Sequence, residues 1–441
     1  MHARYYLRSF GCQMNEHDAE RIRALLEARG LERADEPDDA DVLVYNTCTV
    51  RKSADDRLAG HLGTAARLKR EDPSRVVLVT GCLPQAEQAG FFARFPFVDG
   101  ALGPQNLHRL PDLLEAAVEP AAEGPAGFFE DGPHFSGSLA ARRERPFQAW
   151  VQVMSGCTNF CSYCIVPYVR GPERSRSVEE LVNEVRGLVA DGVREVTLLG
   201  QNVNAFGRDL RDGGEALAPG FAGLLRHLDA IEGLERIRFM TSHPKDLSDD
   251  LVLAVAELPS VCEHVHLPAQ AGSDKVLGAM RRGYTAGEYL ERVAALRAAV
   301  PCVSITTDLI AGFPGETEGD FEQTLGLVRE ASFDAAYTFV YSPRTGTAAA
   351  ELPDQVPPEV RRERVERLIE LTQEQALRSH LAWVGRRADV LVEGVSRDGL
   401  LHRGRTRQNV TVNLSGAVEA GAIVMVEVTA ATSTTLRGTT V

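Results

Sequence analysis

The sequence predicts an α/β protein made of an N-terminal parallel-sheet domain, a central partial (β/α)6 barrel and a small C-terminal antiparallel β-barrel. The chain has 441 residues, enough for roughly three domains of about 150 residues each. Short apolar runs alternate with amphipathic helical stretches through most of it, a pattern typical of parallel sheets. The last stretch instead has alternating apolar runs separated by Gly and Asp, without a helical pattern. That change indicates a separate small barrel.

The first predicted domain is 1–118, where strands and helices alternate. The strands are expected at 5–10, 42–45 and 76–79, and the helices at 17–29, 53–70 and 84–94. Residues 119–146 hold four Pro, four Gly and five Ala. That composition predicts a linker or a loose surface segment.

The second predicted domain is 147–376. Its strands are expected at 149–154, 195–199, 236–240, 263–267, 304–309 and 336–341, with helices such as 178–190, 286–299 and 321–329. Six such units make a β/α barrel the natural architecture, and a charged helix from 358 to about 382 follows them. The third domain, 377–441, has strand-like runs at 388–393, 409–414 and 424–429.

Composition and charge limit the function classes. The net charge of −14 argues against wholesale wrapping of nucleic acid, although a local basic cluster can still bind phosphate. No window approaches the roughly 18 apolar residues of a membrane span, and residues 1–6 lack the apolar core of a secretory signal. We therefore expect a soluble cytoplasmic protein without a membrane partner.

Eight cysteines occur in the chain. In a cytoplasmic protein of this size they indicate metal or redox chemistry rather than disulfides. Cys262 and Cys302 lie on or beside apolar strands, and we interpret both as core residues.

Cys157, Cys161 and Cys164 form a C-x3-C-x2-C array after a predicted strand. Three thiolates on one loop can bind three irons of a [4Fe–4S] cluster and leave the fourth iron open. A structural zinc site normally needs four protein ligands, and no fourth Cys or His is near in the sequence. The array therefore predicts an iron–sulfur site at the C-terminal ends of the barrel strands.

Cys12, Cys48 and Cys82 each lie just beyond a predicted strand of the first domain. The carboxyl ends of parallel strands meet at one edge of a sheet, so we expect these thiols to converge. They would again form a cluster site with one open iron. The alternative is three buried structural thiols, because free Cys is common in cores.

The C-x3-C-x2-C array resembles that of the radical S-adenosylmethionine (SAM) superfamily. The resemblance implies that SAM binds the open iron and that Tyr163, before the third cysteine, packs by the adenine. It also implies SAM contacts at the ends of the second and fifth barrel strands. These residues are Gly200, Gln201, Asn202, Ile310, Gly312 and Glu316. Taken alone, such glycines more often mark turns.

Almost the whole chain resembles the radical SAM methylthiotransferase family, which carries an N-terminal domain with a second cluster, a radical SAM barrel and a C-terminal TRAM domain. The run SFGCQMNE at 9–16 is similar to the MiaB-like branch, which acts on isopentenyladenosine in tRNA. TSHP at 241–244, HLP at 266–268, MRRGYT at 280–285 and YSPR at 341–344 are also similar to that branch. AQAGS at 269–273 departs from the usual Val-Gln-Ser-Gly-Ser.

The resemblance implies methylthiolation of carbon 2 of N6-isopentenyladenosine next to the tRNA anticodon. One SAM would donate a methyl group to sulfur held at the open iron of the first cluster, and a second SAM would yield the radical that abstracts hydrogen. The implied cofactors are two [4Fe–4S] clusters and SAM. The implied partners are tRNA, an electron donor such as a flavodoxin or ferredoxin, and an iron–sulfur assembly or sulfur-delivery system.

Two other functions remain open from the sequence. The same chemistry could act on threonylcarbamoyladenosine in tRNA or on an aspartate of a ribosomal protein. A non-catalytic iron–sulfur protein that binds RNA or senses oxygen is the rival from another class, and it predicts no SAM cleavage under reduction.

Two groups of arginines are candidates for RNA contacts. Basic residues gather in the C-terminal domain at Arg397, Arg403, Arg405 and Arg407. A small β-barrel with a basic loop fits RNA binding through phosphate contacts, whereas an ordinary solvated surface is the alternative. Arg170, Arg174 and Arg176 follow the cysteine array. They could contact tRNA phosphates or pair with Glu173 and Glu179.

Overall fold

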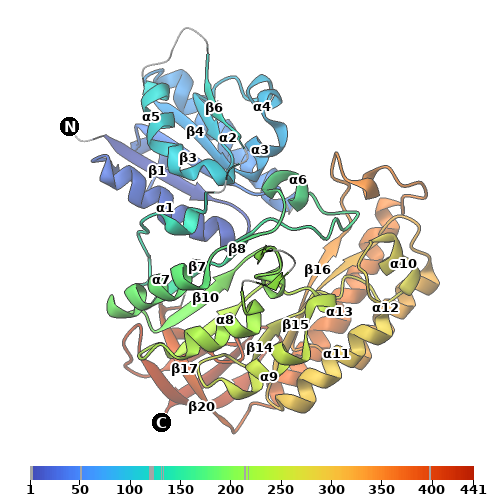
Figure 1. The fold of residues 1–441 in the computed structure, drawn as a ribbon. Coiled ribbons are helices and arrows are strands. Elements are labelled where there is room, and N and C mark those ends of the chain that lie inside the picture. The colour runs from blue at the N-terminus through green and yellow to red at the C-terminus, as the bar shows by residue number, and fades with distance from the viewer. Residues whose placement is uncertain are drawn as a thin grey trace. The chain divides into compact units, whose positions relative to one another are not determined.

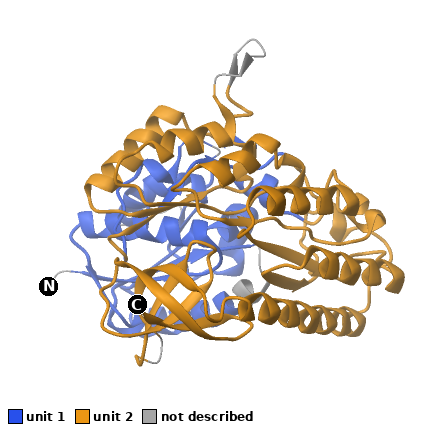
Figure 2. Cartoon of the chain, turned by 90° about the horizontal axis from the view of Figure 1, so that it is seen from below, with its two compact units in different colours: residues 1–144, 150–158, 164–174 blue, residues 145–149, 159–163, 175–441 orange. Residues whose placement is uncertain are grey.

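The computed structural model describes residues 3–49, 52–118, 124–130, 132, 134–212, 215–216, 218–396 and 399–441. The chain divides into two compact units (Figure 2). The first contains 1–144, 150–158 and 164–174, and the second contains 145–149, 159–163 and 175–441. The predicted boundaries at 118, 146 and 376 stay predictions, and the division into units passes through the predicted barrel domain.

The first unit contains a six-stranded parallel sheet in the order β2-β1-β3-β4-β5-β6 (Figure 1). Its strands are β1 (Arg4–Ser9), β2 (Glu32–Arg33), β3 (Val42–Thr47), β4 (Val76–Gly81), β5 (Gly100–Leu102) and β6 (Ala126–Phe128). Its α-helices are α1 (Gln13–Ala28), α2 (Lys52–Glu71), α3 (Cys82–Glu87), α4 (Ala89–Arg94), α5 (Leu110–Val118) and α6 (Val166–Arg170). Short 3-10 helices are η1 (Pro37–Asp39), η2 (Pro104–Arg109) and η3 (Ser136–Ser138). The predicted parallel-sheet domain is confirmed.

Strands β3 and β4 separate two cores because successive side chains point to opposite faces of the sheet. The face covered by α2 carries Leu43, Tyr45, Val77 and Val79. The face covered by α1 and α5 carries Val42, Val44, Val76 and Leu78. Both strands are buried along their whole length, as expected of parallel strands covered on both faces.

Two expectations for this unit need correction. The helix expected at 84–94 is two short helices, because Gln88 between them has a positive φ of 45°. The segment 119–146 is more than a linker: β6 pairs in parallel with β5 and extends the sheet. The physical reason is that β5 would otherwise leave its backbone donors and acceptors unpaired at the sheet edge.

The second unit continues the β/α series with β10 (Glu195–Leu199), β13 (Arg236–Phe239), β14 (His264–His266), β15 (Ser304–Ala311) and β16 (Ala335–Val340). Parallel ladders join β10 to β13 and β14 to β15 and β16. These strands begin and end within two residues of the predicted ranges. The division between the units crosses β7 (Gln148–Gln152) and β9 (Arg174–Ser175), and β8 (Met154–Ser155) belongs to the first unit.

Helices connect these strands and cover them. They are α7 (Val178–Ala190), α8 (Gly220–Asp229), α9 (Asp249–Glu257), α10 (Asp274–Ala279), α11 (Ala286–Ala299), α12 (Glu318–Ala331) and α13 (Pro358–Leu381). Local chemistry sets several of their starts: Thr285 and Glu288 form a capping box at α11, and Thr317 and Asp320 form one at α12. The short elements are η4 (Val203–Ala205), β11 (Arg211–Asp212), β12 (Glu215–Ala216), η5 (Pro244–Asp246) and η6 (Ala348–Ala350).

The C-terminal segment is a closed barrel in the order β17-β18-β19-β21-β20. Its strands are β17 (Arg387–Val395), β18 (His402–Thr406), β19 (Thr411–Ser415), β20 (Ile423–Ala431) and β21 (Thr435–Thr440). Buried valines and leucines such as Val390, Val412 and Leu436 fill it. The small barrel is confirmed, but the β19–β21 pair is parallel. The sequence did not show β18 and β21, whose Arg, Gly and Thr residues lack an apolar alternation.

One cysteine prediction is wrong: Cys262 is buried, but Cys302 is exposed. Cys302 lies in the turn between α11 and β15, so its side chain points to solvent and not into the sheet. Among the described residues, no helix combines the length and apolar character that crossing a membrane requires.

Candidate functional site

The three dispersed cysteines lie at the carboxyl ends of neighbouring strands of the first unit. Cys12 follows β1 and is the N-cap of α1, Cys48 follows β3, and Cys82 begins α3 directly after β4. Cys48 and Cys82 are buried and Cys12 is half-buried. A Cβ atom at Gly11 would lie 2.2 Å from Cβ of Cys48. The glycine, with φ of 121°, therefore allows the first two cysteine loops to approach each other.

A polar frame fixes the loops that carry Cys12 and Cys48. Asn15 Nδ2 donates to Thr47 O at 2.8 Å and to Asn46 Oδ1 at 3.2 Å. Asn46 Nδ2 in turn donates to Asn15 O at 2.9 Å. Asn15 also accepts a hydrogen bond from Cys12 Sγ at 3.3 Å. Both asparagines are buried, so these bonds replace the water that each side chain would otherwise need.

The surroundings favour a thiolate at Cys12. A hydrogen bond with Cys48 lowers the pKa of Cys12 to about 6, against the opposing effect of burial, and Arg170 and the backbone of α1 add to the lowering. Burial raises the pKa of Cys82, which Arg170 partly offsets. The thiolate is the form of cysteine that binds metal, so the surroundings of Cys12 favour binding of a metal ion or cluster.

The described residues contain no group of three or more His, Cys, Asp or Glu side chains arranged to hold a metal ion. A [4Fe–4S] cluster makes a different demand, since each thiolate binds its own iron and the ligands stand around a larger body. The donor set of Cys12, Cys48 and Cys82, with a cationic Arg170 beside it, fits that demand in ligand type and number.

The C-x3-C-x2-C loop is divided between the units. Cys157 and Cys164 belong to the first, and Cys161 with Tyr163 to the second. In the first unit, Cys157 N donates to Gly171 O at 3.1 Å. In the second, Ser162 N donates to Met280 O at 3.0 Å and Ser162 Oγ to Ala279 O at 2.8 Å. The start of the loop is thus bound to the first unit, and its middle, at Ser162, to the second.

Arg282 is a buried partner of this loop that the sequence reasoning did not single out. Its Nη1 donates to Cys161 Sγ at 3.4 Å and its Nη2 to Pro268 O at 2.9 Å. Its Nε donates to the hydroxyl of Tyr284 at 2.9 Å. Arg282 is part of the MRRGYT run, whose similarity to one family branch indicates no role for this residue. The hydrogen bond from Arg282 holds the sulfur of Cys161 in place within the second unit.

His243 lies in the same region, with its ring 5.7 Å from that of Tyr284. Burial lowers its pKa to about 2, and Arg282 and Lys245 act in the same direction. Its Nδ1 accepts from Lys245 N at 3.3 Å, and its Nε2 is buried without a hydrogen-bond partner in the described structure. The imidazole is therefore neutral, with one polar atom available to a ligand.

Tyr163 and Ile310 pack against the same apolar group of buried residues, which includes Phe313 and Tyr341. The structure thus brings together Tyr163, which the resemblance places by the adenine, and Ile310, one of the predicted SAM contacts. Gly312 N and Arg364 Nη1 both donate to Glu316 Oε1, at 3.0 and 2.8 Å. These bonds hold the turn after β15. The predicted SAM contacts of Gly312 and Glu316 stay predictions.

Gly200, Gln201 and Asn202 follow the end of β10, as predicted. Asn202 is buried and its Nδ2 donates to Asp246 Oδ2 at 2.8 Å. Its Oδ1 is buried with no hydrogen-bond partner among the residues described. An unsatisfied buried acceptor at a strand end is a candidate for an N–H or O–H donor of a ligand.

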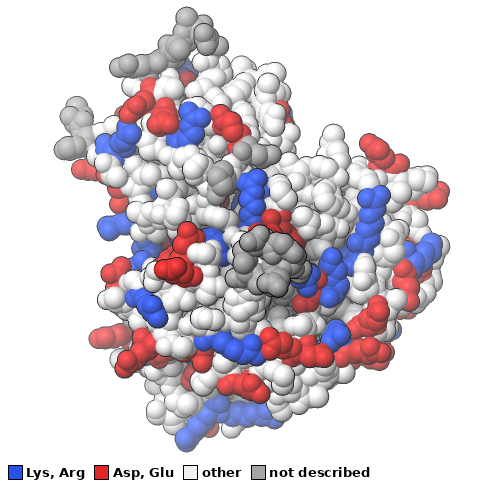
Figure 3. All heavy atoms as spheres, in the orientation of Figure 1, with Lys and Arg blue, Asp and Glu red and all other residues white. Residues whose placement is uncertain are grey.

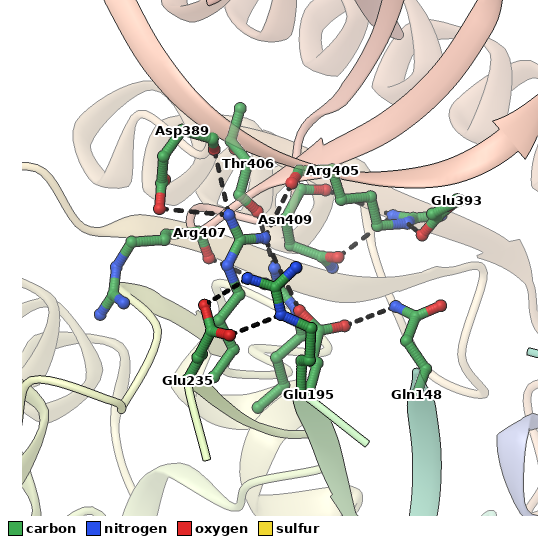
Figure 4. A network of polar contacts seen from close by, with 12 residues as sticks. Gln148, Glu195, Glu235, Asp389, Glu393, Arg405, Thr406, Arg407 and Asn409 are labelled. Carbon is green, nitrogen blue, oxygen red and sulfur yellow. Dashed lines mark hydrogen bonds and ion pairs between the residues drawn. The ribbon is translucent and has the colours of Figure 1, made fainter. Parts of the chain in front are cut away.

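Two of the C-terminal arginines that were expected to contact RNA, Arg405 and Arg407, have acidic partners within the chain. Arg407 Nε donates to both oxygens of Glu263, at 3.0 and 2.9 Å, and its Nη2 to Val261 O. Arg405 donates to Glu393 and Asn409, as Figure 4 shows. Arg403 is the most exposed of the three and lies 3.9 Å from Glu393. Arg397 lies outside the described residues.

These contacts belong to a buried network that joins the small barrel to the β/α strands of the same unit (Figure 4). Arg238 Nε donates to Glu195 Oε2, and its two terminal nitrogens donate to the carbonyl oxygens of Arg407 and Thr406. Arg236 donates to the carbonyls of Arg405 and Asp389. The β18–β19 turn is therefore a docking surface in this structure.

The arginines after the cysteine array also have internal partners. Arg174 donates to Gly132 O, Arg176 pairs with Glu184, and Arg170 pairs with Asp18. Arg170 and Arg176 are buried, which argues against direct contacts of these two side chains with tRNA phosphates. Asp18, the partner of Arg170, comes from a segment distant in sequence, so no local pattern shows it, whereas Glu184 lies eight residues after Arg176.

Family models match three segments of the chain. Residues 4–103 match the uncharacterized protein family UPF0004, residues 151–328 the radical SAM superfamily, and residues 382–441 the TRAM domain. A tRNA-2-methylthio-N(6)-dimethylallyladenosine synthase from Carboxydothermus hydrogenoformans is 48% identical over 429 residues, covering 96% of both chains. The synthase of the same name from Caldicellulosiruptor saccharolyticus is 48% identical and covers 93% of this chain and 86% of its own.

The chain belongs to this synthase family. It is accordingly a radical SAM enzyme with a TRAM domain. Among solved structures, the radical SAM methyltransferase TsrM from Kitasatospora setae has a TM-score of 0.57 at 14% identity, covering 79% of this chain and 77% of its own. That likeness concerns the fold. The family membership agrees with the prediction from the SFGCQMNE run and excludes the non-catalytic alternative.

Proposed function

We propose that the chain methylthiolates carbon 2 of N6-isopentenyladenosine (dimethylallyladenosine) next to the anticodon of tRNA. The observation that carries this assignment is the convergence of Cys12, Cys48 and Cys82 at one sheet edge, in a chain whose C-x3-C-x2-C array belongs to a radical SAM domain. The family's named members support the choice of substrate over threonylcarbamoyladenosine or a protein side chain.

Each set of three cysteines holds one [4Fe–4S] cluster in this proposal. When bound, the clusters supply the electron that cleaves SAM and the sulfur that is transferred. The chain's own contribution is to keep the ligands ionised and in place. At Cys12 the hydrogen bond with Cys48, the charge of Arg170 and the backbone N–H groups of α1 favour the thiolate. At Cys161 a hydrogen bond from Arg282 holds the sulfur in place.

SAM binds in the second unit. Tyr163 and Ile310 provide an apolar surface for the adenine, and the buried Asn202 Oδ1 is available to accept a hydrogen bond from the SAM amino group. Gly200 and Gln201 line the same strand end. Glu316 does not contact SAM directly. Its Oε1 accepts hydrogen bonds from Gly312 N and Arg364 Nη1, which hold the turn after β15 beside the adenine.

tRNA contacts involve Arg403 and Arg397 of the TRAM domain. Arg405 and Arg407 instead belong to the buried network that joins the small barrel to the β/α strands, since their guanidinium groups already have partners there. Lys/Arg and Asp/Glu side chains are interspersed over the face drawn in Figure 3. Acidic side chains lower the affinity of such a surface for phosphate, so recognition depends on individual arginines and on an unstacked base of the anticodon loop.

The proposal includes a cytoplasmic location and two further partners. A flavodoxin or ferredoxin supplies electrons, and an iron–sulfur assembly or sulfur-delivery system restores the first cluster. Both partners follow from the chemistry, because each turnover uses an electron and a sulfur atom.

The first test counts iron after anaerobic reconstitution. The wild-type chain is expected to bind about eight irons, and a Cys157/Cys161/Cys164→Ala variant about four. Cys302→Ala is the matched control, because that exposed thiol lies outside both sites, and it should leave the iron count unchanged. About four irons in the wild type, all lost in the triple variant, would contradict the first site.

The second test uses substrates directly. Under reducing anaerobic conditions, tRNA carrying isopentenyladenosine should gain one methylthio group, detected by mass spectrometry of its nucleosides. tRNA carrying threonylcarbamoyladenosine and a purified ribosomal protein serve as controls and should remain unchanged. Modification of either control in preference to the first substrate would refute the assignment.

A further inference from the structure

Arg170 is a buried cation whose place in the fold differs from its place in the sequence. It lies six residues after Cys164, as the last residue of α6, yet α6 packs against α3, which begins at Cys82. The side chain is 6% exposed. It therefore belongs to the surroundings of Cys12, Cys48 and Cys82, although the sequence attaches it to the other cysteine array.

The backbone and side chain of Arg170 are both held in place. Gln105 Nε2 donates to Arg170 O at 2.8 Å, and Gln105 Oε1 accepts from Gly132 N at 3.0 Å. Asp18, also buried, has Oδ2 at 3.8 Å from Arg170 Nη2. The other carboxylate oxygen of Asp18 accepts from Ser136 Oγ at 2.9 Å. This support fixes the direction of the guanidinium group.

The guanidinium still has donors to spare. An arginine carries five N–H donors, and 3.8 Å is too long for a hydrogen bond. Nη2 is buried without a hydrogen-bond partner within the described residues. Arg170 also interacts with the thiols of Cys82 and Cys12. A buried charged donor without a partner costs free energy, and such groups are retained where a ligand completes them.

The missing partner has to be anionic and small. The thiols of Cys82 and Cys12 and the carboxylate of Asp18 already lie near this cation, and a sulfur species on the open iron would add further negative charge in a buried site. An N–H donor next to that position would stabilise a thiolate or hydrosulfide more than a neutral ligand, because a charge-assisted hydrogen bond is stronger at low dielectric.

We propose that Arg170 binds the small anionic sulfur ligand at the open iron of the Cys12/Cys48/Cys82 site. The inference rests on the proposed function, which places a cluster there. Asp18 is a positioning residue that keeps Nη2 directed toward this ligand. The arginine next to the radical SAM array thus serves the sulfur-donating site.

The test uses the full chain with Cys157, Cys161 and Cys164 replaced by alanine, so that only the first site can bind iron. Arg170→Met removes the charge at similar size, and Arg170→Lys keeps it. Arg29→Met is the control. Cys12 precedes the 16-residue helix α1 and Arg29 follows it. At 1.5 Å per residue the two residues are about 24 Å apart. Sodium methanethiolate is the probe, titrated against the absorption and electron paramagnetic resonance spectra.

All four proteins are expected to bind about four irons. Arg170→Met should weaken methanethiolate binding about 10- to 100-fold, the range of one charge-assisted hydrogen bond, and should shift the cluster's reduction potential to a more negative value. Arg170→Lys and Arg29→Met should stay near the parent in potential. An Arg170→Met protein with parental affinity and potential would overturn the inference.

The other outcomes are also decisive. Absence of iron in the parent would refute the cluster of the proposed function, independently of Arg170. Loss of iron in Arg170→Met but not in Arg170→Lys would support a role for the charge at the site. Loss of iron in both would overturn the proposal and make Arg170 a residue needed for folding.

Discussion

The buried network beneath the small barrel gives a stability prediction that can be worked from distances. Arg238 is 5% exposed. It donates to Glu195 Oε2 at 2.9 Å and to the carbonyl oxygens of Arg407 and Thr406 at 2.8 and 2.7 Å. Arg238→Met removes all three bonds and leaves two carbonyls and one carboxylate oxygen with fewer partners.

Breaking a buried ion pair typically costs about 3–5 kcal/mol. Glu195 keeps a hydrogen bond from Gln148 at 2.6 Å and a longer ion pair with Arg236 at 3.7 Å, so the lower end applies. We expect Arg238→Met to lower the free energy of unfolding by about 3 kcal/mol, which corresponds to roughly 6–12 °C in Tm for a unit of this size.

Differential scanning calorimetry of the full chain measures this change. The matched control is Arg226→Met, which breaks an exposed ion pair with Asp250, whose side chains are 42% and 56% exposed. Exposed pairs contribute about 0–1 kcal/mol, so this control should shift Tm little. If the two variants shift Tm equally, the reasoning about burial is wrong.

Three further predictions follow from single residues. Gly11→Ala places a Cβ 2.2 Å from Cys48 Cβ at a φ of 121°; it should cost about 2–4 kcal/mol and halve the iron count, and a full iron count would contradict the tight approach of the two loops. Burial raises the pKa of Glu20 to about 7 from 4.5, so the contribution of Glu20 to the free energy of unfolding is most favourable below about pH 4.5 and falls as the pH rises to about 7. Glu20→Gln should therefore stabilise the chain by up to about 3 kcal/mol at pH 8 and little at pH 4.5 in urea unfolding, and an equal effect at both values would refute the shift. Arg403→Gln should weaken tRNA binding and reduce its salt dependence by about one counterion, whereas Arg407→Gln should lower Tm instead, and the reverse result would show that the two arginines have been assigned wrongly.

The sequence by itself predicted most of the secondary structure and indicated six cysteines as candidate cluster ligands. Buried parallel strands such as β3 and β4 are continuous apolar runs, and amphipathic helices such as α7 carry a period close to 3.6 residues, so local patterns suffice. The cysteines after β1, β3 and β4 could be expected at one place because parallel strands share an edge. The sequences of β18 and β21 lack an alternation of apolar residues, so they gave no comparable signal.

Only the tertiary structure decided what the charged residues do. Arg170, Arg405 and Arg407 look alike in the sequence, but their partners Asp18, Glu393 and Glu263 come from other segments. A charged side chain has no periodic signature, and its role depends on what the fold places within about 4 Å of it. Hydrophobic patterns are local, whereas the pairing and burial of charges are properties of the folded chain.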